Sequence, residues 1–487
     1  MVDLDAVFKA YDIRGVVPDQ LDGELARAVG AAFARFAGGD RVIVARDARP
    51  SSPELVAAFT AGVTATGTDV VDIGLASTDL LYFAAGRLDA PGAMFTASHN
   101  PAAYNGIKLC LAGARPVGQD TGLAEIRAQV ADTAAGAAEH TAAQVADTAA
   151  GAAEHTAAGA AEHTAAGAAE HTAAGAAEHT AAGTVSSADL LDDFATHVRS
   201  FVDLGALRPL VVVADVANGM GGLVVPRVFE GLPFELEVLY GELDGTFPNH
   251  PADPIQPENL KALQSRVLEV GADVGLAFDG DADRVFLVDD RAEPLSGSTT
   301  TSLVARSLLE AHPGATITYN LICSKAVPEL IAERGGTPVR TRVGHSFIKA
   351  VMAETGALFG GEHSGHYYFR DNYRADSGLI ASVVILEQLS KAGRPLSELR
   401  RSLERYAASG EVNVTVEDPG AVLERVAAAF PGAGLDRTDG LTVDCGPWWF
   451  NVRPSNTEPL LRINLEAPDD VAVRQHLDEV LALAKGG

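Results

Sequence analysis

Short apolar runs rich in β-branched residues alternate with segments of helical spacing along most of the chain. In the first part, the runs 41–45, 69–73 and 93–96 predict strands, and the apolar positions of 53–66 recur as in an amphipathic helix. Strands that alternate with helices are typical of an α/β fold. Residues 1–128 therefore form a first predicted α/β domain.

The same alternation returns after residue 183. It predicts two further α/β domains, which we place at 184–294 and 295–406. The last region, 407–487, begins with a strand pattern and ends with a helix, which is typical of a smaller α+β domain. The strands expected in these three regions are 209–214, 273–278, 316–319 and 411–416, and the helices are 188–194, 260–271, 326–333 and two that begin at 421 and 469.

Residues 129–183 interrupt this pattern with a low-complexity repeat. The octapeptide Gly-Ala-Ala-Glu-His-Thr-Ala-Ala occurs five times, and no large apolar residue lies between Val145 and Val185. Such a segment cannot build a core. In a helix its neighbouring histidines would be separated by a rise of about 12 Å, so they could not share one metal ion. We expect a dispensable surface insertion.

Charge and cysteine content limit the possible functions. The net charge of −28 disfavours nonspecific binding to nucleic acid or anionic lipid, and a phosphate site would have to be built locally from cations and backbone N–H groups. Three scattered cysteines, Cys110, Cys323 and Cys445, fit a reducing compartment. The chain has no signal-peptide pattern and no apolar run that could span a bilayer. We therefore expect a cytoplasmic protein without nucleic-acid or membrane partners.

The loop 96–101, Thr-Ala-Ser-His-Asn-Pro, contains the first candidate for chemistry. It follows the predicted strand 93–96, and open α/β sheets place their ligands at such strand ends. Ser98 is the candidate nucleophile. A serine needs a base or a metal beside it, and a lone loop serine is more often a turn former. The assignment therefore depends on the other motifs.

The loop 279–284, Asp-Gly-Asp-Ala-Asp-Arg, is a candidate metal site. Asp279, Asp281 and Asp283 alternate directly after a predicted strand and can converge on one hard cation. A helix–loop–helix calcium site would need glycine at the sixth position and normally glutamate at the twelfth, where this chain has Arg284 and Asp290. The pattern favours Mg²⁺ over Ca²⁺, and a charged hairpin without metal is the alternative.

Two further loops carry polar groups suited to a phosphorylated sugar. The stretch 360–366 contains Glu362, Ser364 and His366 among glycines, which let a ligand approach the backbone. The stretch 453–459 begins with Arg453, and its hydroxyls, amide and turn backbone predict a phosphate-binding loop. Each is a weak or moderate signal alone, because polar turns are common.

These four loops together resemble the motifs of the α-D-phosphohexomutases, in the order of that family. The resemblance covers nearly the whole chain apart from 129–183, and the sugar loop Gly-Glu-His-Ser-Gly-His is similar to the phosphomannomutase/phosphoglucomutase branch. It implies three similar α/β domains with mixed sheets and a smaller α+β C-terminal domain around a central cleft, with one motif from each domain. We expect a monomer.

The resemblance also implies roles for individual residues. Ser98 would carry a phosphate, and Ser98, Asp279, Asp281 and Asp283 would hold Mg²⁺. Lys108, His345 and Arg284 would act in proton transfer, phosphate contact or charge stabilisation. The substrate-binding residues implied are Arg14, Glu362, Ser364, His366, Arg453, Ser455, Asn456 and Thr457. Lys325 lies near a position where relatives have a phosphate-contacting lysine, but its spacing differs and we leave it out.

The implied reaction interconverts hexose 6-phosphate and hexose 1-phosphate, for mannose and also for glucose, through a bound hexose 1,6-bisphosphate. A phosphoserine-dependent sugar phosphatase is the alternative, because water can hydrolyse a phosphoserine. A non-catalytic binding protein would not need the complete set of serine and metal ligands.

Overall fold

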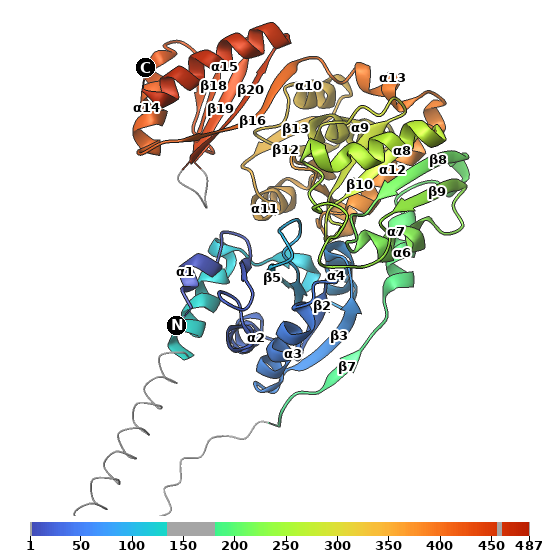
Figure 1. The fold of residues 1–487 in the computed structure, drawn as a ribbon, viewed down its shortest axis with the longest axis vertical. Helices are drawn as coiled ribbons and strands as arrows, with labels where there is room; N and C mark the ends of the chain where they lie inside the picture. Colours follow the sequence, from blue (N-terminus) through green and yellow to red (C-terminus); the bar gives the residue numbers. More distant parts are fainter. Residues whose placement is uncertain (1, 134–180, 455–459, 487) are drawn as a thin grey trace, which may run out of the picture.

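The computed structural model describes residues 2–133, 181–454 and 460–486, and in these ranges the chain forms four sheets. Figure 1 shows the first domain at the bottom, the second at the right, the third in the upper middle and the last at the upper left. The predicted three α/β domains with mixed sheets and smaller α+β domain are confirmed. Within the described residues, no helix is long and apolar enough to cross a membrane.

The first domain has a mixed sheet with strand order β1-β5-β4-β2-β3-β7, and β6 pairs with β5. Strands β2, β3, β4 and β7 pair in parallel, whereas β1, β5 and β6 are antiparallel to their neighbours. Residues 123–133 are also helical. The elements are α1 (Leu4–Val7), β1 (Ile13–Val16), α2 (Gly23–Ala37), β2 (Arg41–Arg46), α3 (Ser52–Thr64), β3 (Asp69–Leu75), α4 (Thr78–Arg87), β4 (Gly92–Phe95), β5 (Tyr104–Leu111), β6 (Arg115–Pro116) and β7 (Val185–Ser187).

The second domain has a four-stranded sheet with the order β11-β10-β8-β9, in which only β11 is antiparallel. The third domain repeats this plan with the order β13-β12-β14-β15, in which only β15 is antiparallel. The elements of the second are α6 (Leu191–Arg199), β8 (Leu210–Asp215), α7 (Gly221–Phe229), β9 (Phe234–Leu239), α8 (Lys261–Val270), β10 (Val274–Phe278) and β11 (Val285–Asp289). Those of the third are α9 (Gly297–Ala311), β12 (Thr316–Asn320), α10 (Ala326–Glu333), β13 (Thr337–Thr341), α11 (His345–Thr355), β14 (Phe359–Gly361), β15 (Tyr367–Phe369), α12 (Gly378–Ala392) and α13 (Leu396–Arg401).

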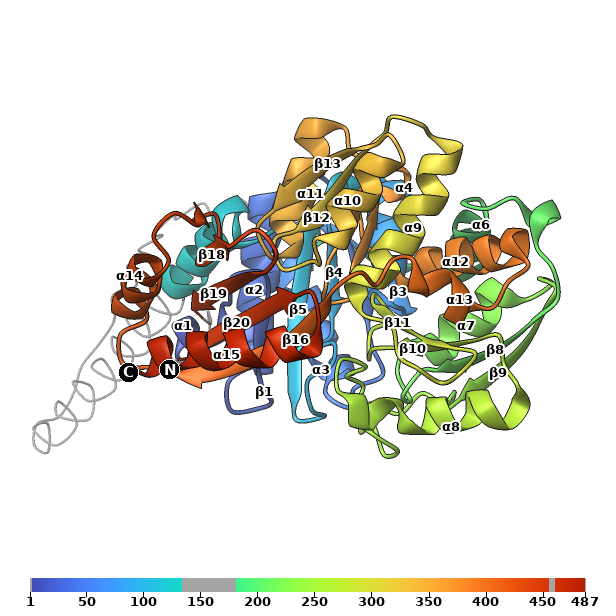
Figure 2. The same ribbon diagram turned by 90° about the horizontal axis from the view of Figure 1, so that it is seen from above.

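The last domain has an antiparallel sheet with the order β16-β20-β19-β18-β17, covered by two helices. Figure 2 shows α15 lying along this sheet. The Asp418 and Asp469 side chains accept hydrogen bonds from the first N–H groups of α14 and α15, which fixes where these helices begin. The elements are β16 (Ala407–Thr415), α14 (Pro419–Ala429), β17 (Gly434–Asp436), β18 (Leu441–Asp444), β19 (Trp449–Pro454), β20 (Leu460–Ala467) and α15 (Asp470–Lys485).

Helix α12 packs in a hydrophobic core that the second and third domains share. Almost all of its residues are buried, and the core cluster that contains it draws side chains from both domains. A helix that is apolar on all sides must be covered on all sides. The apolar run of α12 therefore fixes how these two domains pack.

Two boundaries of the first domain differ in detail from our division of the chain. Strand β7 pairs in parallel with β3, so Val185–Ser187 completes the first sheet, although our boundary assigns it to the second domain. Val130 is only 3% exposed and belongs to the core of the first domain, although our insertion begins at residue 129. The rest of the repeat, 134–180, lies outside the described residues.

Candidate active site

Ser98 lies where the strand β4 ends, as the sequence predicts. Its side chain is 5% exposed, and its backbone has a positive φ of 50°, which is uncommon for a residue other than glycine. Ser98 N donates to Thr96 Oγ1 at 2.9 Å, and Ser98 Oγ donates to Asp279 Oδ2 at 2.7 Å. The structure thus joins the serine loop of the first domain to the acidic loop of the second.

The Arg49 side chain holds the serine loop, residues 96–101, in place. Its guanidinium is 1% exposed and donates four hydrogen bonds to backbone carbonyls of that loop region, while Nε binds Asp47 Oδ2 at 3.0 Å. The four acceptors are the carbonyls of Ser98, Asn100, Pro101 and Tyr104, at 2.7–2.9 Å. A planar guanidinium can serve several acceptors at once. Arg49 therefore fixes the loop shape on which the position of Ser98 depends.

Gly280 allows the acidic loop to approach the serine loop. A Cβ at this position would lie 2.4 Å from the Ser98 carbonyl oxygen, so any side chain would push the two loops apart. The glycine between the first two aspartates is therefore required by the contact between domains.

Three carboxylates converge after β10. One oxygen each of Asp279, Asp281 and Asp283 lies within 4.8 Å of the others, and all three side chains are buried. Asp281 Oδ1 and Asp283 Oδ1 have no hydrogen-bond partner among the described residues. Burial raises the pKa of Asp279 to about 7, against the opposing effect of Arg284. Three buried carboxylates with two open oxygens fit a divalent cation, since a hard cation is bound by such oxygens.

Lys108 and Thr78 bind the same carboxylates from the first domain. Lys108 Nζ donates to Asp281 Oδ2 at 2.7 Å and to Asp283 Oδ2 at 2.8 Å, and Thr78 Oγ1 donates to Asp281 Oδ2 at 2.6 Å. Burial would raise the pKa of Asp281, but Lys108 and Thr78 outweigh it and the pKa is lowered. Lys108 pairs with Met94 across β4 and β5, so the sheet register brings it to the serine loop.

Two arginines place positive charge beside Ser98. Arg284 Nε donates to Asp279 Oδ2 at 2.9 Å, and its Nη2 lies 3.4 Å from Ser98 Oγ and 2.7 Å from His99 Nδ1. Arg14 binds the Ala97 carbonyl, together with the side chains of Asp12 and Asn100. A phosphate on Ser98 would therefore meet Arg284 directly, with Arg14 bound to the preceding carbonyl of the same loop.

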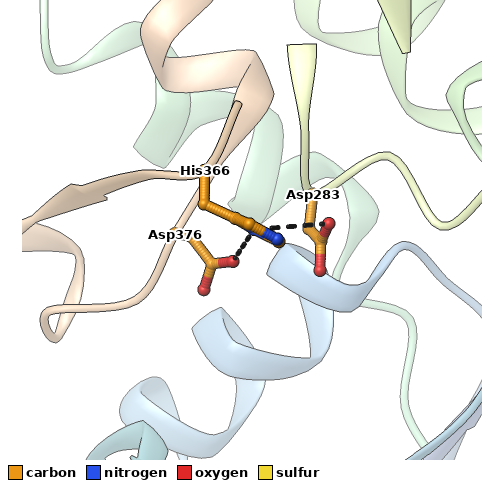
Figure 3. Close-up of side chains that lie close together, drawn as sticks. All are labelled: Asp283, His366 and Asp376. Atoms are coloured by element: carbon orange, nitrogen blue, oxygen red, sulfur yellow. Dashed lines mark hydrogen bonds and ion pairs between the residues drawn. The ribbon is translucent and has the colours of Figure 1, made fainter. Parts of the chain in front are cut away.

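His366 lies beside the acidic loop, residues 279–284 (Figure 3). Its Nδ1 is 2.8 Å from Asp376 Oδ2 and 3.8 Å from Asp283 Oδ1, and Figure 3 shows the ring between the two carboxylates. The backbone of His366 also pairs with that of Arg284. Asp376 is further held by Lys349, whose Nζ lies 3.1 Å from Asp376 Oδ1. The predicted sugar loop, residues 360–366, is thus attached to the acidic loop.

Glu362 lies deeper than a solvent-facing sugar site would require, whereas His345 is half-buried. Glu362 is 2% exposed and accepts from Asn320 Nδ2 at 3.0 Å, Gly344 N at 3.2 Å and Tyr368 OH at 2.5 Å, so in this conformation it binds the protein itself. His345 begins α11. Burial, with Lys349 nearby, lowers the pKa of His345 to about 3, so its ring is neutral at pH 7. Ser364 is half-buried.

Arg453 is the one predicted site residue of the loop 453–459 that the structure describes. It is 8% exposed, its Nη2 donates to Glu411 Oε2 at 2.7 Å, and its Nη1 is buried without a partner among the described residues. An unpaired buried donor is available for an anion. The other three predicted residues of this loop, Ser455, Asn456 and Thr457, lie outside the described residues.

Lys325, which we left out of the site, links the third and fourth domains. Its Nζ donates to Asp444 Oδ1 at 2.8 Å and to the Gly446 carbonyl at 2.9 Å. These two contacts account for the position of the Lys325 ammonium group without a catalytic role.

Several site residues were missed by the sequence analysis. Arg49, Thr78, His99 and Asp376 touch the predicted residues. His99 lies in the predicted loop 96–101 but was not singled out there. Arg49 had a local signal in the run Arg46-Asp-Ala-Arg-Pro50, in which charges directly follow a strand. Thr78 and Asp376 become recognisable only when the domains are assembled.

The geometry defines the class of protein: a multidomain enzyme that brings a serine, an acidic cation site and several arginines to one place, as phosphoryl transfer requires. Family models of phosphoglucomutase/phosphomannomutase match the chain in order. Alpha/beta/alpha domains I, II and III match residues 5–136, 192–293 and 296–406, and the C-terminal domain matches 411–483.

Relatives and solved structures agree with these matches. The chain is 39% identical to the phosphohexose mutases of Xanthomonas campestris over 484 residues, covering 98% of this chain and 99% of the relative. It is 34% identical to a phosphomannomutase/phosphoglucomutase of Pseudomonas aeruginosa, covering 95% and 92%. A phosphoglucomutase/phosphomannomutase family protein from Burkholderia thailandensis superposes with a TM-score of 0.82 at 31% identity, covering 100% and 99%.

The chain therefore belongs to the phosphoglucomutase/phosphomannomutase family, in the α-D-phosphohexomutases. It is an isomerase of this type.

Proposed function

We propose that the chain interconverts hexose 6-phosphate and hexose 1-phosphate through a phosphoserine at Ser98 and a bound hexose 1,6-bisphosphate. The observation that carries this proposal is the contact of Ser98 Oγ with Asp279 at 2.7 Å, with Arg284 beside both. In the first transfer, the bond between Ser98 Oγ and phosphorus breaks and a sugar hydroxyl takes the phosphoryl group. In the second, the other phosphate of the bisphosphate returns to Ser98.

We assign the cation site to Mg²⁺, with Asp279, Asp281, Asp283 and the oxygen on Ser98 as ligands. The two open carboxylate oxygens of Asp281 and Asp283 support this assignment. When bound, the ion would neutralise charge on the transferring phosphoryl group. Lys108 already binds two of these carboxylates, so its ammonium would compete with the ion or lie beside it.

The chain's own cations and bases would orient the reacting groups. Arg284 and Arg14 would hold the phosphate on Ser98, since phosphoryl transfer depends on charge neutralisation and alignment. The proton released by the sugar hydroxyl needs an acceptor. Of the two histidines, His366 is the better acceptor, because its partner Asp376 would stabilise the ring once it is protonated, whereas burial lowers the pKa of His345 and makes it a weak base.

The remaining predicted residues would bind the substrate where the four domains meet. Glu362 and Ser364 would read sugar hydroxyls, which for Glu362 requires exchange of its present partners. Arg453, with Ser455, Asn456 and Thr457, would hold the phosphate that is not reacting. The buried Nη1 of Arg453, which has no partner among the described residues, supports that role. We place this enzyme in the cytoplasm as a monomer.

A phosphoserine-dependent sugar phosphatase remains the second candidate, because the same residues could serve water as the acceptor. The test is to incubate the protein with mannose 1-phosphate and Mg²⁺ and to measure both 6-phosphate isomer and free phosphate. A mutase yields isomer with little free phosphate. Stoichiometric free phosphate would support the phosphatase instead.

The variant Ser98→Ala tests the carrier. Loss of the hydroxyl should reduce turnover by at least about a thousandfold, and intact mass should lose a species heavier by one phosphate. The exposed Ser187→Ala is the matched control and should behave as the unaltered protein. Near-normal turnover in Ser98→Ala would exclude the phosphoserine route.

A further inference from the structure

A cavity of about 630 Å³ lies away from the residues described above, at the junction of the second and third domains. It is lined by the second halves of α9 and α12, by the end of α10 and by the segment that follows α6. Figure 2 shows α9 and α12 near one another, on the α6 side of the molecule. None of the catalytic or substrate-binding residues proposed above lines this cavity.

Positive charge gathers in this cavity. Arg306, Arg334, Arg394 and Lys391 line it, in a chain whose net charge is −28. Arg306 is the buried member, with 8% exposure. Its Nη2 donates to Gln388 Oε1 at 3.2 Å, and it forms no ion pair among the described residues. Burial lowers the pKa of Arg306, and Arg334 and Arg394 lower it further against the opposing effect of Glu310, so three guanidinium groups and one carboxylate share one neighbourhood.

Three acidic residues, Asp203, Glu310 and Glu387, also line the cavity and are already engaged, and the Asp203 carboxylate accepts from Gly205 N at 2.9 Å. Glu387 Oε1 accepts from Lys391 Nζ at 2.9 Å and from Asp203 N at 2.7 Å, and Glu310 faces Arg334 at 3.6 Å. These contacts account for Lys391 and Arg334. Arg306 and Arg394 form no ion pair among the described residues, although the charge of Glu310 acts on Arg306, and a buried guanidinium without a paired anion is unfavourable.

We propose that this cavity is a second ligand site, which binds a small phosphorylated metabolite through Arg306 and Arg394. Arginine suits phosphate because its planar N–H groups match two phosphate oxygens at once. The volume lies within the range of small-molecule sites. A neighbouring cavity of about 390 Å³ shares Phe201, Leu308 and His312, so the uncharged part of the ligand has room beside an aromatic ring.

The test is isothermal titration of the full-length protein with inorganic pyrophosphate at low salt. The protein carries Arg453→Gln to weaken binding at the phosphate loop. We expect saturable binding that Arg394→Gln weakens by about tenfold or more, because each charged hydrogen bond contributes that much. Arg306→Gln should do the same. Arg291→Gln, an exposed arginine outside the cavity, should leave binding unchanged.

The outcomes separate the proposal from its rivals. Arg394 is exposed, so its variant folds even if loss of the buried Arg306 destabilises the protein, and Arg394→Gln alone then decides. No saturable binding, or binding unaffected by Arg394→Gln, overturns the site. Binding of citrate without binding of pyrophosphate overturns the assignment to phosphate and points to a polycarboxylate.

Discussion

Asp281 shows how single side chains of the site depend on one another. It accepts from Lys108 and Thr78 with one oxygen and leaves Oδ1 open. Asp281→Asn removes one ligand charge while keeping the shape, so affinity for Mg²⁺ should fall by at least about tenfold. Activity should then need more Mg²⁺ in a titration, and EDTA should abolish activity in the unaltered protein. The exposed Asp478→Asn is the control. Full activity in excess chelator would contradict the metal site.

Asp79 is a second buried carboxyl, and its environment predicts a pH dependence of stability. It lies at the start of α4, accepts from Ser77 and Ser377, and burial raises its pKa to about 7. Between pH 4 and 7 the folded chain keeps Asp79 protonated while the unfolded chain does not. The free energy of unfolding therefore falls as the pH rises, by at most about 4 kcal/mol from this group.

The variant Asp79→Asn isolates that contribution. A neutral amide cannot ionise, so the melting temperature of the variant should gain on that of the unaltered protein as the pH rises from 4.5 to 8. Thermal denaturation across this range measures the difference, and the exposed Asp120→Asn is the control. A melting-temperature difference that does not change with pH would contradict the assignment.

At the scale of elements, the loop after β4 is shaped by a residue from a different segment. Arg49, which follows β2, supplies the four bonds that hold the loop. Arg49→Lys keeps the charge but cannot reach all four carbonyls, so it should cost about 3 kcal/mol of stability and lower kcat. Thermal denaturation and steady-state kinetics check both, with the exposed Arg35→Lys as control. Unchanged melting temperature and kcat would mean that the loop 96–101 keeps its conformation without the Arg49 hydrogen bonds.

The repeat is also best understood at the scale of elements. Its first copy begins inside the helix that spans residues 123–133, where Val130 packs in the core. The second copy begins at Gln144 with the same four residues. The sequence does not show that Val130 belongs to a core, because the same residues recur in the second copy. Its contacts in the first domain show that it does.

At the scale of the whole molecule, the start of α4 is one of the places where the first domain is fastened to the second and third. Thr78 at the start of α4 binds Asp281, and Asp79 beside it binds Ser377 at the start of α12. The site is therefore assembled from three domains at the end of one helix, with the last domain attached through contacts such as that of Lys325 with Asp444. In the proposed reaction, a bisphosphate that turns over would have to be bound in two orientations.

This requirement predicts the substrate range. Contacts that serve both orientations must use hydroxyls in similar places, and the 3- and 4-hydroxyls satisfy this. Mannose and glucose share them and differ at C2. We expect both 1-phosphates to be substrates, with kcat/KM within about a hundredfold. Glu362→Gln, which keeps the shape of the side chain, should lower both in parallel, whereas the exposed Glu354→Gln should lower neither. A difference of several orders of magnitude would contradict the shared-hydroxyl argument.

The sequence by itself determined the elements and the spacing of the chemical groups, because both are local. The helix predicted at 326–333 coincides with α10, and the alternation of Asp279, Asp281 and Asp283 after a strand already indicated one cation site. Only the tertiary structure decided which distant segments meet. The contact of Ser98 with Asp279, the clamp by Arg49, the pairing of β7 with β3 and the partnership of His366 with Asp376 leave no local pattern. Such contacts arise when whole domains bury their apolar faces together, and the polar side chains at the junctions are brought into contact by that packing.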